Sequence, residues 1–368
     1  MAVIHVVIPC YNVDEYIEQA VSSIINQPNG RTDVVLVDDG SPGKTPEKCD
    51  ELANDFQNVY VVHQKNGGLS SARNAGIEFV LNNLFTPGNR EFIAFLDGDD
   101  AWLPNVIDEG IIDQFLYEWT EDVIGFSGVT SNTEMTRFSA PVAVTERENA
   151  SGAELVWDAQ HVHLCAKFYS VRIFVDYGLR FQPKQLYTED RIFIYQYFFL
   201  ADSARLCSRP LHIYRKNRGG IMSSLAKLSA SEHYLPIVDG WMKCDLFLNN
   251  RSGITGRQSE GGYALAAVYL VEMVAEHYQK WGKRKVVQQV FDSHPHYLYT
   301  KNVDPKNLTE VAYKENRLLF ERPRMFEIKH RLAGIVLWVL RNMLKLQFVR
   351  KLREKRKFPY LLKDIANT

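Results

Sequence analysis

The sequence predicts an α/β protein built on a mainly parallel β-sheet, followed by a helical C-terminal region. Two observations support this prediction. In the first hundred residues, short β-branched or apolar runs alternate with amphipathic stretches of helical length, as in right-handed βαβ units. Polar residues directly follow three of the four predicted strands, and ligands bind at the carboxyl ends of strands in such sheets.

Each predicted strand is nearly continuous in Val, Ile, Leu or Phe, as expected for a strand that is buried on both faces. Amphipathic helices are predicted between the strands, and Thr45 is expected to cap the second of them. The predicted strands are residues 3–8, 34–37, 59–62 and 92–96, and the predicted helices are 14–26, 45–55 and 70–81.

Residues 104–221 are mixed and irregular in pattern, apart from an apolar-aromatic run at 192–200. The chain then becomes mainly helical, which places a domain boundary near 220–230. We therefore predict one domain at 1–225 and a helical region with a basic amphipathic tail at 226–368. The helices predicted in this second region are 234–248, 262–281, 286–291 and 325–357.

Charge is unevenly distributed along the chain. The net charge is −1, yet residues 322–357 contain twelve Lys or Arg against two Glu, so the remainder is acidic. A basic amphipathic helix suits an anionic membrane surface, and the alternative is a helix packed on the catalytic domain. We see no aromatic-basic interleaving typical of nucleic-acid binding, so no nucleic-acid partner is expected.

The remaining bulk properties predict a cytoplasmic protein, either free or peripheral at the inner face of the membrane through that tail. The five cysteines are scattered without a C-x-x-C pair, which argues against a disulfide framework or a zinc site. No basic start is followed by an apolar run, so no secretory signal is expected. The apolar stretch 333–340 is far shorter than the roughly 20 residues that span a bilayer.

Asp97-Gly98-Asp99-Asp100 is the most informative segment. Carboxylates this close repel one another unless a cation neutralises them, and oxygen ligands without nearby His or Cys favour Mg²⁺ or Mn²⁺. Such a site uses one or two carboxylates together with substrate phosphates. The alternative is an acidic, solvated turn.

Two other strand ends carry candidate nucleotide ligands. Asp38-Asp39 is either an ordinary Asp-Gly turn or, beside a second acidic strand end, a reader of base or ribose N–H and O–H groups. Pro9 and Tyr11 are either loop packing or a platform for a base, since aromatic rings stack on bases. Arg73 follows a Gly67-Gly68 turn at a helix start, where anions bind, and the alternative is a surface arginine.

Two later segments are weaker signals when each is considered alone. Glu189-Asp190 precedes the aromatic run and suits a general base, or simply a helix start capped by Thr188. The loop at 212–220 concentrates cations, including Arg215 and Arg218, which suits a diphosphate leaving group. A solvated basic loop is the alternative.

Together the segments are more specific. VVIPCYN, VVLVDDGS, GGLSSARNAG, FLDGDD, TED and IYRKNRGGIMSS occur in this order over residues 1–225. This set resembles the family 2 inverting glycosyltransferases, which have the GT-A fold. The resemblance implies Mn²⁺ or Mg²⁺, a UDP-sugar donor such as a hexose or N-acetylhexosamine, and a glycan or lipid-linked acceptor. It also implies a role in bacterial cell-surface glycan or polysaccharide synthesis.

The resemblance also assigns roles to residues. Asp190 is implied as the catalytic base, and Asp97 and Asp99 as metal ligands. Processive members carry Q-x-x-R-W or R-x-x-R-W, whereas Gly219 stands here where Trp would, which favours one sugar per encounter. The implied nucleotide-binding residues are Pro9, Tyr11, Asp39, Arg73 and Asp97, and those expected at the diphosphate or acceptor are Glu189, His212, Arg215 and Arg218.

Two other functions remain as alternatives. A nucleotidyltransferase that makes sugar nucleotides also uses a parallel sheet and a metal. It should carry a Gly-rich basic loop after the first strand, where this chain has Pro9-Cys10-Tyr11-Asn12. A non-catalytic sugar-nucleotide-binding module would not need Asp190.

Overall fold

The structure, a computed structural model, describes residues 3–28, 31–151, 164–185, 188–216, 230–252 and 329. The chain divides into two compact units, residues 1–220 and 221–368. The second unit is described through one long helix, α8 (Ala230–Asn249), which contains the helix predicted at 234–248. The predicted helices at 262–281 and 286–291 lie outside the described residues. So does the basic tail, apart from the helical residue 329.

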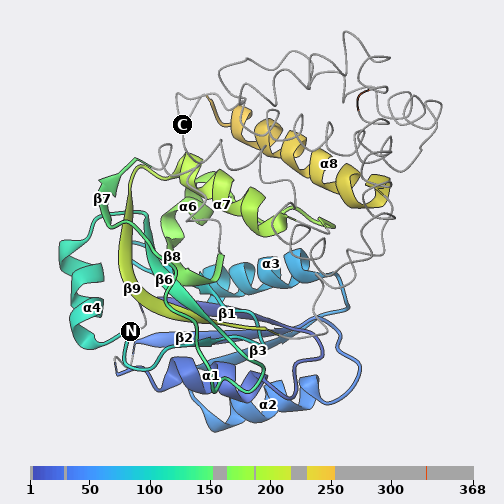
Figure 1. The fold of residues 1–368 in the computed structure, drawn as a ribbon, viewed down its shortest axis with the longest axis vertical. Helices are drawn as coiled ribbons and strands as arrows, with labels where there is room; N and C mark the ends of the chain where they lie inside the picture. Colours follow the sequence, from blue (N-terminus) through green and yellow to red (C-terminus); the bar gives the residue numbers. More distant parts are fainter. Residues whose placement is uncertain are drawn as a thin grey trace, which may run out of the picture. The chain divides into compact units, whose positions relative to one another are not determined.

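The predicted α/β fold is confirmed. Nine described strands form one mixed sheet in the order β3-β2-β1-β4-β8-β6-β9-β5, with β7 paired to β9. The first four in this order are parallel to one another (Figure 1). They are β1 (Ile4–Cys10), β2 (Thr32–Asp38), β3 (Val59–His63) and β4 (Phe92–Phe95), which match the four predicted strands.

The other half of the sheet comes from the region whose sequence pattern is irregular. Here β8 is antiparallel to both β4 and β6, whereas β6 and β9 are parallel. Gly, Ser, Pro and Arg interrupt β6 and β9, so neither reads as a continuous apolar run. The strands are β5 (Ala101–Trp102), β6 (Val123–Ser131), β7 (Arg147–Ala150), β8 (Lys167–Ser170) and β9 (Ala204–Arg215).

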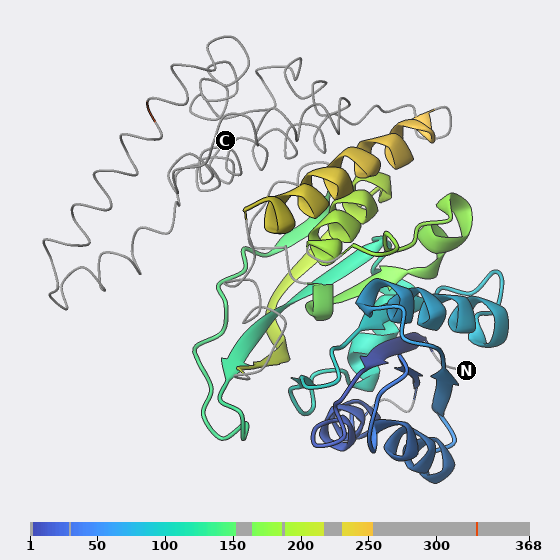
Figure 2. The ribbon, with the colours of Figure 1, turned by 90° about the vertical axis from the view of Figure 1, so that its right-hand side faces the viewer.

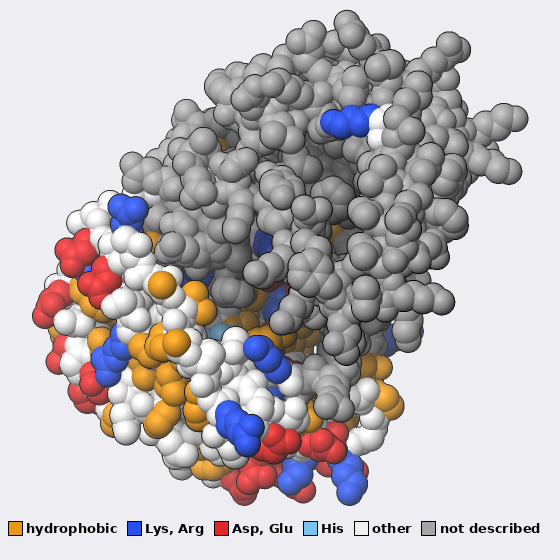
Figure 3. All heavy atoms as spheres, in the orientation of Figure 1, with side chains coloured by type: hydrophobic (Ala, Val, Ile, Leu, Met, Phe, Trp, Pro, Cys, Tyr) orange, Lys and Arg blue, Asp and Glu red, His pale blue; other side chains and the backbone are white. Residues whose placement is uncertain are grey.

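Helices cover both faces of the parallel half. α1 (Ile17–Ile25) and α2 (Thr45–Asp55) lie on one face and α3 (Leu69–Phe79) on the other (Figures 1 and 2). Figure 3 shows acidic side chains gathered around α2 and α4, in keeping with the acidic body of the chain. The other helices among the described residues of this unit are α4 (Glu109–Asp113), α6 (Val171–Tyr177) and α7 (Glu189–Leu200), with single turns at Val80–Leu84, Gln114–Glu118 and Leu164–Ala166. No helix in the described part of the chain is long and apolar enough to cross a bilayer.

The predicted cap of α2 is wrong. The residue before the helix is Lys44, and Thr45 makes a tertiary contact instead: its hydroxyl accepts a hydrogen bond from the main-chain N–H of Val13, at 3.0 Å. Ser70 does not cap α3 either, because Gly68 precedes that helix with a φ of 84°. Glycine adopts this left-handed conformation without steric cost.

Gly76 allows α3 to pack tightly on β1. A β-carbon at this position would lie 2.2 Å from Cγ1 of the buried Val7. We therefore expect Gly76→Ala to lower the free energy of unfolding by about 1–3 kcal/mol, although alanine favours helices. Urea denaturation measures this. The control is Gly110→Ala in α4, where the nearest atom is 3.4 Å away; equal stability of the Gly76 and Gly110 variants would contradict the packing argument.

Candidate functional site

The predicted acidic strand ends lie side by side. Cys10 pairs with Asp38 across β1 and β2, and the Asp39 N–H donates to the Cys10 carbonyl at 3.0 Å. β4 lies on the other side of β1, so its terminal residue Phe95 brings the segment 97–100 to the same edge of the sheet. This edge is where open α/β sheets bind ligands.

The acidic turn is anchored to β9 through Asp100. This carboxylate is buried, with one oxygen 2.8 Å from Nε2 of His212 and the other accepting a hydrogen bond from the Arg215 N–H at 2.8 Å. Burial raises the pKa of Asp100, and the contact with His212 opposes that rise. Asp97 and Asp99 are only partly buried. The turn thus has one buried, structural carboxylate and two that are partly exposed.

Arg73 joins the acidic turn to the start of α7. Nη2 donates to Asp97 Oδ1 at 2.9 Å and Nη1 donates to Glu189 Oε1 at 3.2 Å. The side chain of Arg73 is only 3% exposed, against 37% for Asp97. The two carboxylates raise the pKa of Arg73 despite its burial. Arg73 therefore contacts the neighbouring acidic groups and has almost no surface for a ligand.

Packing fixes Arg73 in this position. The guanidinium lies 5.3 Å from the Phe181 ring centroid. Asn74 holds Phe181 through two main-chain hydrogen bonds, each 2.8 Å long. Phe181 in turn stacks on Phe193 of α7 with ring centroids 4.0 Å apart. Sequence reasoning missed Asn74 and Phe181, because their partner segments are more than a hundred residues apart.

Asp190 occupies the first turn of α7, where acidic residues interact favourably with the helix dipole. It is partly buried, and one carboxylate oxygen accepts from the Arg191 N–H at 2.7 Å. The negative charge of Asp190 acts on Lys167 of β8. Burial lowers the pKa of the Lys167 amine from 10.5 to about 8, and the negative charge of Asp190 opposes this shift. Sequence reasoning missed this lysine, because nothing in the pattern of β8 marks it.

The lowered pKa of Lys167 makes a stability prediction. Between about pH 8 and 10.5 the unfolded chain holds a proton that the folded chain has released, so this group makes stability rise with pH. The free energy of unfolding of Lys167→Met, taken relative to that of wild type, should therefore fall by about 2 kcal/mol between pH 7 and pH 9.5. Denaturation of both proteins at both pH values measures this, and a pH-independent difference would refute it.

The nucleotide-side residues differ in accessibility. Both carboxylate oxygens of the buried Asp39 already accept hydrogen bonds: from the N–H groups of Gly67 and Gly68, each at 2.8 Å, and from Gln64 Nε2 at 2.6 Å. Asp39 thus fixes the glycine loop ahead of α3. Pro9 is buried within β1, whereas Tyr11 is 48% exposed just beyond that strand.

Arg215 is buried among protein groups. Nε donates to the Asp99 carbonyl at 2.5 Å, Nη2 donates to Gln19 Oε1 at 2.6 Å, and Nη1 donates to the Thr133 carbonyl. The guanidinium also lies 4.7 Å from the Tyr16 ring centroid. Arg215 and His212 therefore hold the acidic turn from β9. The expected partner cation Arg218 lies outside the described residues.

The carboxylates present fit a hard divalent cation that arrives with a phosphate ligand. Within the described ranges, no cluster of three or more His, Cys, Asp or Glu side chains could hold a metal alone. Asp97 and Asp99 offer two oxygen ligands, and Mg²⁺-type sites commonly combine one or two carboxylates with substrate phosphates and water.

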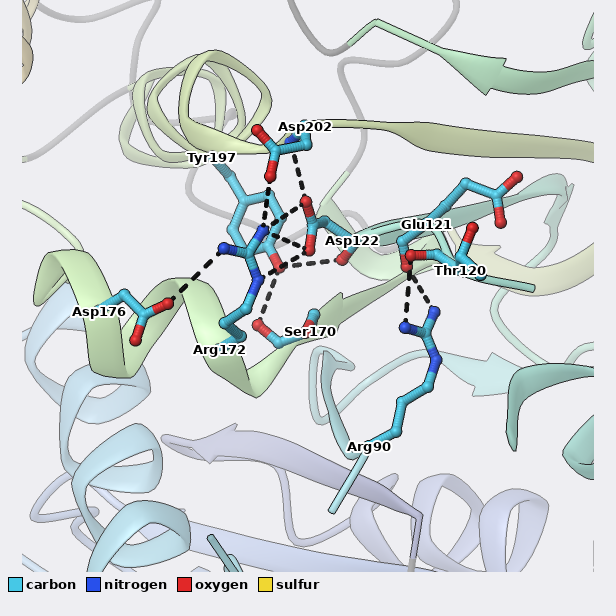
Figure 4. Close-up of polar contacts among 9 residues, drawn as sticks. All are labelled: Arg90, Thr120, Glu121, Asp122, Ser170, Arg172, Asp176, Tyr197 and Asp202. Atoms are coloured by element: carbon cyan, nitrogen blue, oxygen red, sulfur yellow. Dashed lines mark hydrogen bonds and ion pairs between the residues drawn. The ribbon is translucent and has the colours of Figure 1, made fainter. Parts of the chain in front are cut away.

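A second cleft, of about 440 Å³, lies at the opposite end of β4. Its charges pair within the protein (Figure 4): Arg172 Nη2 donates to Asp122 at 2.8 Å and to Asp202 at 3.1 Å. Arg90 donates to main-chain carbonyls, including that of Glu121 at 2.7 Å. This network joins the strand ends and α6, and we assign it a structural role. The lining residues are Gly88, Asn89, Arg90, Thr120, Asp122, Ser170, Arg172, Asp202 and Ser203.

The chain is similar in sequence to known glycosyltransferases. Residues 5–175 match the family model described as glycosyl transferase family 2. EpsJ of Bacillus subtilis (strain 168), named an uncharacterized glycosyltransferase, is 26% identical over 241 residues, which are 62% of this chain and 66% of EpsJ. GgaA of the same organism, named a minor teichoic acid biosynthesis protein, is 33% identical over 106 residues, or 28% of this chain and 22% of GgaA. The matches therefore span less than two thirds of either relative.

Among solved structures, residues 1–349 of S. aureus TarS in complex with UDP-GlcNAc are 18% identical to this chain. The TM-score is 0.53, and the match covers 88% of this chain and 92% of that one. At this level of identity the likeness shows the fold alone, and it confirms the GT-A architecture.

Proposed function

We propose that this chain, whose residues 5–175 match the model of glycosyl transferase family 2, is an inverting enzyme that transfers a sugar from a UDP-sugar to an acceptor hydroxyl. One observation carries the proposal. Arg73 bonds both to the acidic turn, at Asp97, and to Glu189, so the helix turn that carries the candidate base lies beside the candidate metal ligands. A non-catalytic sugar-nucleotide-binding module would not need a base at Asp190.

Each end of the donor has candidate partners. Tyr11, half-exposed beyond β1, is the candidate for stacking on the uracil ring, whereas Pro9 is buried within that strand. Asp39 fixes the glycine loop and keeps a carboxylate lone pair for the base or ribose. Arg218 is the candidate cation for the diphosphate. His212 and Arg215 act on the diphosphate indirectly, by holding the acidic turn.

Asp97 and Asp99 would hold Mn²⁺ or Mg²⁺, which when bound neutralises charge on the diphosphate as it departs. Asp190 accepts the proton of the acceptor hydroxyl while that oxygen bonds to the anomeric carbon. The bond to the UDP oxygen breaks on the opposite face, so the anomeric centre inverts in one displacement. UDP leaves with the electron pair of the broken bond.

The biological setting is part of the proposal. GgaA is named for teichoic acid biosynthesis, and the solved TarS complex contains UDP-GlcNAc. These similarities favour a hexose or N-acetylhexosamine donor and an acceptor in a bacterial cell-surface polymer.

Metal and nucleotide should bind cooperatively, since the described residues offer only part of a coordination shell. In calorimetry, we expect UDP to bind at least about tenfold more tightly in Mn²⁺ than in EDTA, and Mn²⁺ to bind more tightly by the same factor with UDP present. UDP affinity that is unchanged by EDTA would contradict the proposed metal role. No UDP binding under either condition would refute the donor assignment.

A further inference from the structure

Arg73 and Glu189 form a contact that the proposed chemistry does not itself use. Arg73 is almost fully buried, and Glu189 is 14% exposed with Oε1 directed at the guanidinium. Burial raises the pKa of Glu189, and the adjacent Arg73 charge counteracts that rise. Arg73 is thus committed to both carboxylates and Glu189 to Arg73, with little surface of either side chain left for a donor or acceptor.

We propose that Arg73 and Glu189 are positioning residues that hold the metal-binding turn in register with the catalytic base on α7, an inference that rests on the proposed function. Asp97 and Glu189 are separated by 92 positions in the chain, and the two nitrogen atoms of a single planar guanidinium bind them both. A planar fork sets angle as well as distance, which the single ammonium of lysine does not.

The apolar contacts between these elements leave this orientation open. Phe193 of α7 meets Phe95 of β4 edge-on, with ring centroids 5.7 Å apart, and stacks on Phe181. Such aromatic pairs are favourable over a range of centroid separations, about 4.5–7 Å, so they restrict position less narrowly than a hydrogen bond does. The polar bridge is directional, and it acts one residue away from Asp190. A small rotation of the first turn of α7 would move the base relative to Asp97.

The backbone before Glu189 supports the same conclusion. Thr188 has a φ of 60° and a ψ of 15°, a left-handed conformation that is unusual for a β-branched residue. Its buried hydroxyl has no hydrogen-bond partner among the described residues. Such strain persists where surrounding structure requires it, commonly at functional sites. Here it directs the first turn of α7 so that Glu189 reaches Arg73.

The test is a double-mutant cycle of Arg73→Lys and Glu189→Gln in the full chain, read out as kcat, the KM for the UDP-sugar and the Kd for UDP in Mn²⁺. Each single variant should lower kcat by about 10- to 100-fold, as misplacement by about 1 Å does, with the Kd for UDP changed by less than about threefold. The kcat of the double variant should be at most about threefold below that of the less active single variant, because both changes break the same bridge.

Glu78→Gln is the matched control. Glu78 pairs with Arg180 at 2.7 Å on the surface of the same unit, and its loss should leave kcat unchanged. If Arg73→Lys fails to fold, Arg73→Met, which removes the buried cation, replaces it in the cycle. Multiplicative losses in the double variant, or a tenfold weaker Kd for UDP in Glu189→Gln, would overturn the positioning role while wild-type turnover still supports the proposed function. A wild type that turns over no UDP-sugar would overturn both.

Discussion

Asp190→Asn is expected to lower kcat by about 10²- to 10⁴-fold, the range that positioned general bases contribute, while the affinities for UDP and Mn²⁺ stay near those of wild type. Asparagine has nearly the same shape as aspartate but cannot accept the acceptor proton. Asp190 lies in the first turn of α7 and is proposed to act on the acceptor hydroxyl and not on the nucleotide, so the affinity for UDP should change little.

Steady-state kinetics with a UDP-sugar, combined with calorimetry of UDP binding, measure this effect. Asp176→Asn is the control, because Asp176 is an exposed carboxylate that pairs with Arg172 at 3.6 Å, away from the acidic turn. Near-normal turnover by Asp190→Asn would show that another group removes the proton, and the role of Asp190 would have to be abandoned.

Asp99→Asn should produce the second large effect, this time on the metal. Asp100 is buried against His212 and the Arg215 N–H, so the partly exposed Asp97 and Asp99 are the candidate carboxylate ligands of the turn. Converting one of them to an amide removes half of the negative charge offered to the ion. We expect the apparent Kd for Mn²⁺ to rise at least about tenfold and kcat/KM to fall by more than about 10².

The experiment is a Mn²⁺ titration of turnover at fixed UDP-sugar concentration. Asp113→Asn, at an exposed position of α4, is the control and should follow the wild-type curve. If Asp99→Asn were saturated by the same Mn²⁺ concentration as wild type, Asp99 would not be a ligand. Recovery of the rate at high Mn²⁺ would instead fit a weakened site.

The parallel half of the sheet could be predicted because each of its strands is marked by its own short stretch of sequence. Val34 to Val37 and Phe92 to Leu96 are continuous apolar runs that end in acidic turns, and parallel βαβ connection places those turns at one edge. The strand β9 could not be predicted in the same way. Its outward-facing Arg and Ser residues and its proline obscure the period, and its partners are set by the tertiary fold.

For the site residues, the sequence predicts the type of side chain at a position but not the direction in which that side chain points. Arg73 and Arg215 are both cations in motif segments, yet their side chains are buried against Asp97 and Glu189 in one case and against Gln19 and main-chain carbonyls in the other. A motif identifies the residue type at a position, but the direction of its side chain depends on contacts with distant segments. Only the fold reveals that these arginines organise the acidic turn.

The most direct test of the account is UDP release from a panel of UDP-sugars by the wild-type protein, with Mn²⁺ and with EDTA. We predict release from at least one UDP-hexose or UDP-N-acetylhexosamine in Mn²⁺, its loss in EDTA, and its loss in Asp190→Asn. Release that persists in EDTA, or turnover confined to sugars carried on other nucleotides, would contradict a metal-dependent UDP-sugar transfer at this edge of the sheet.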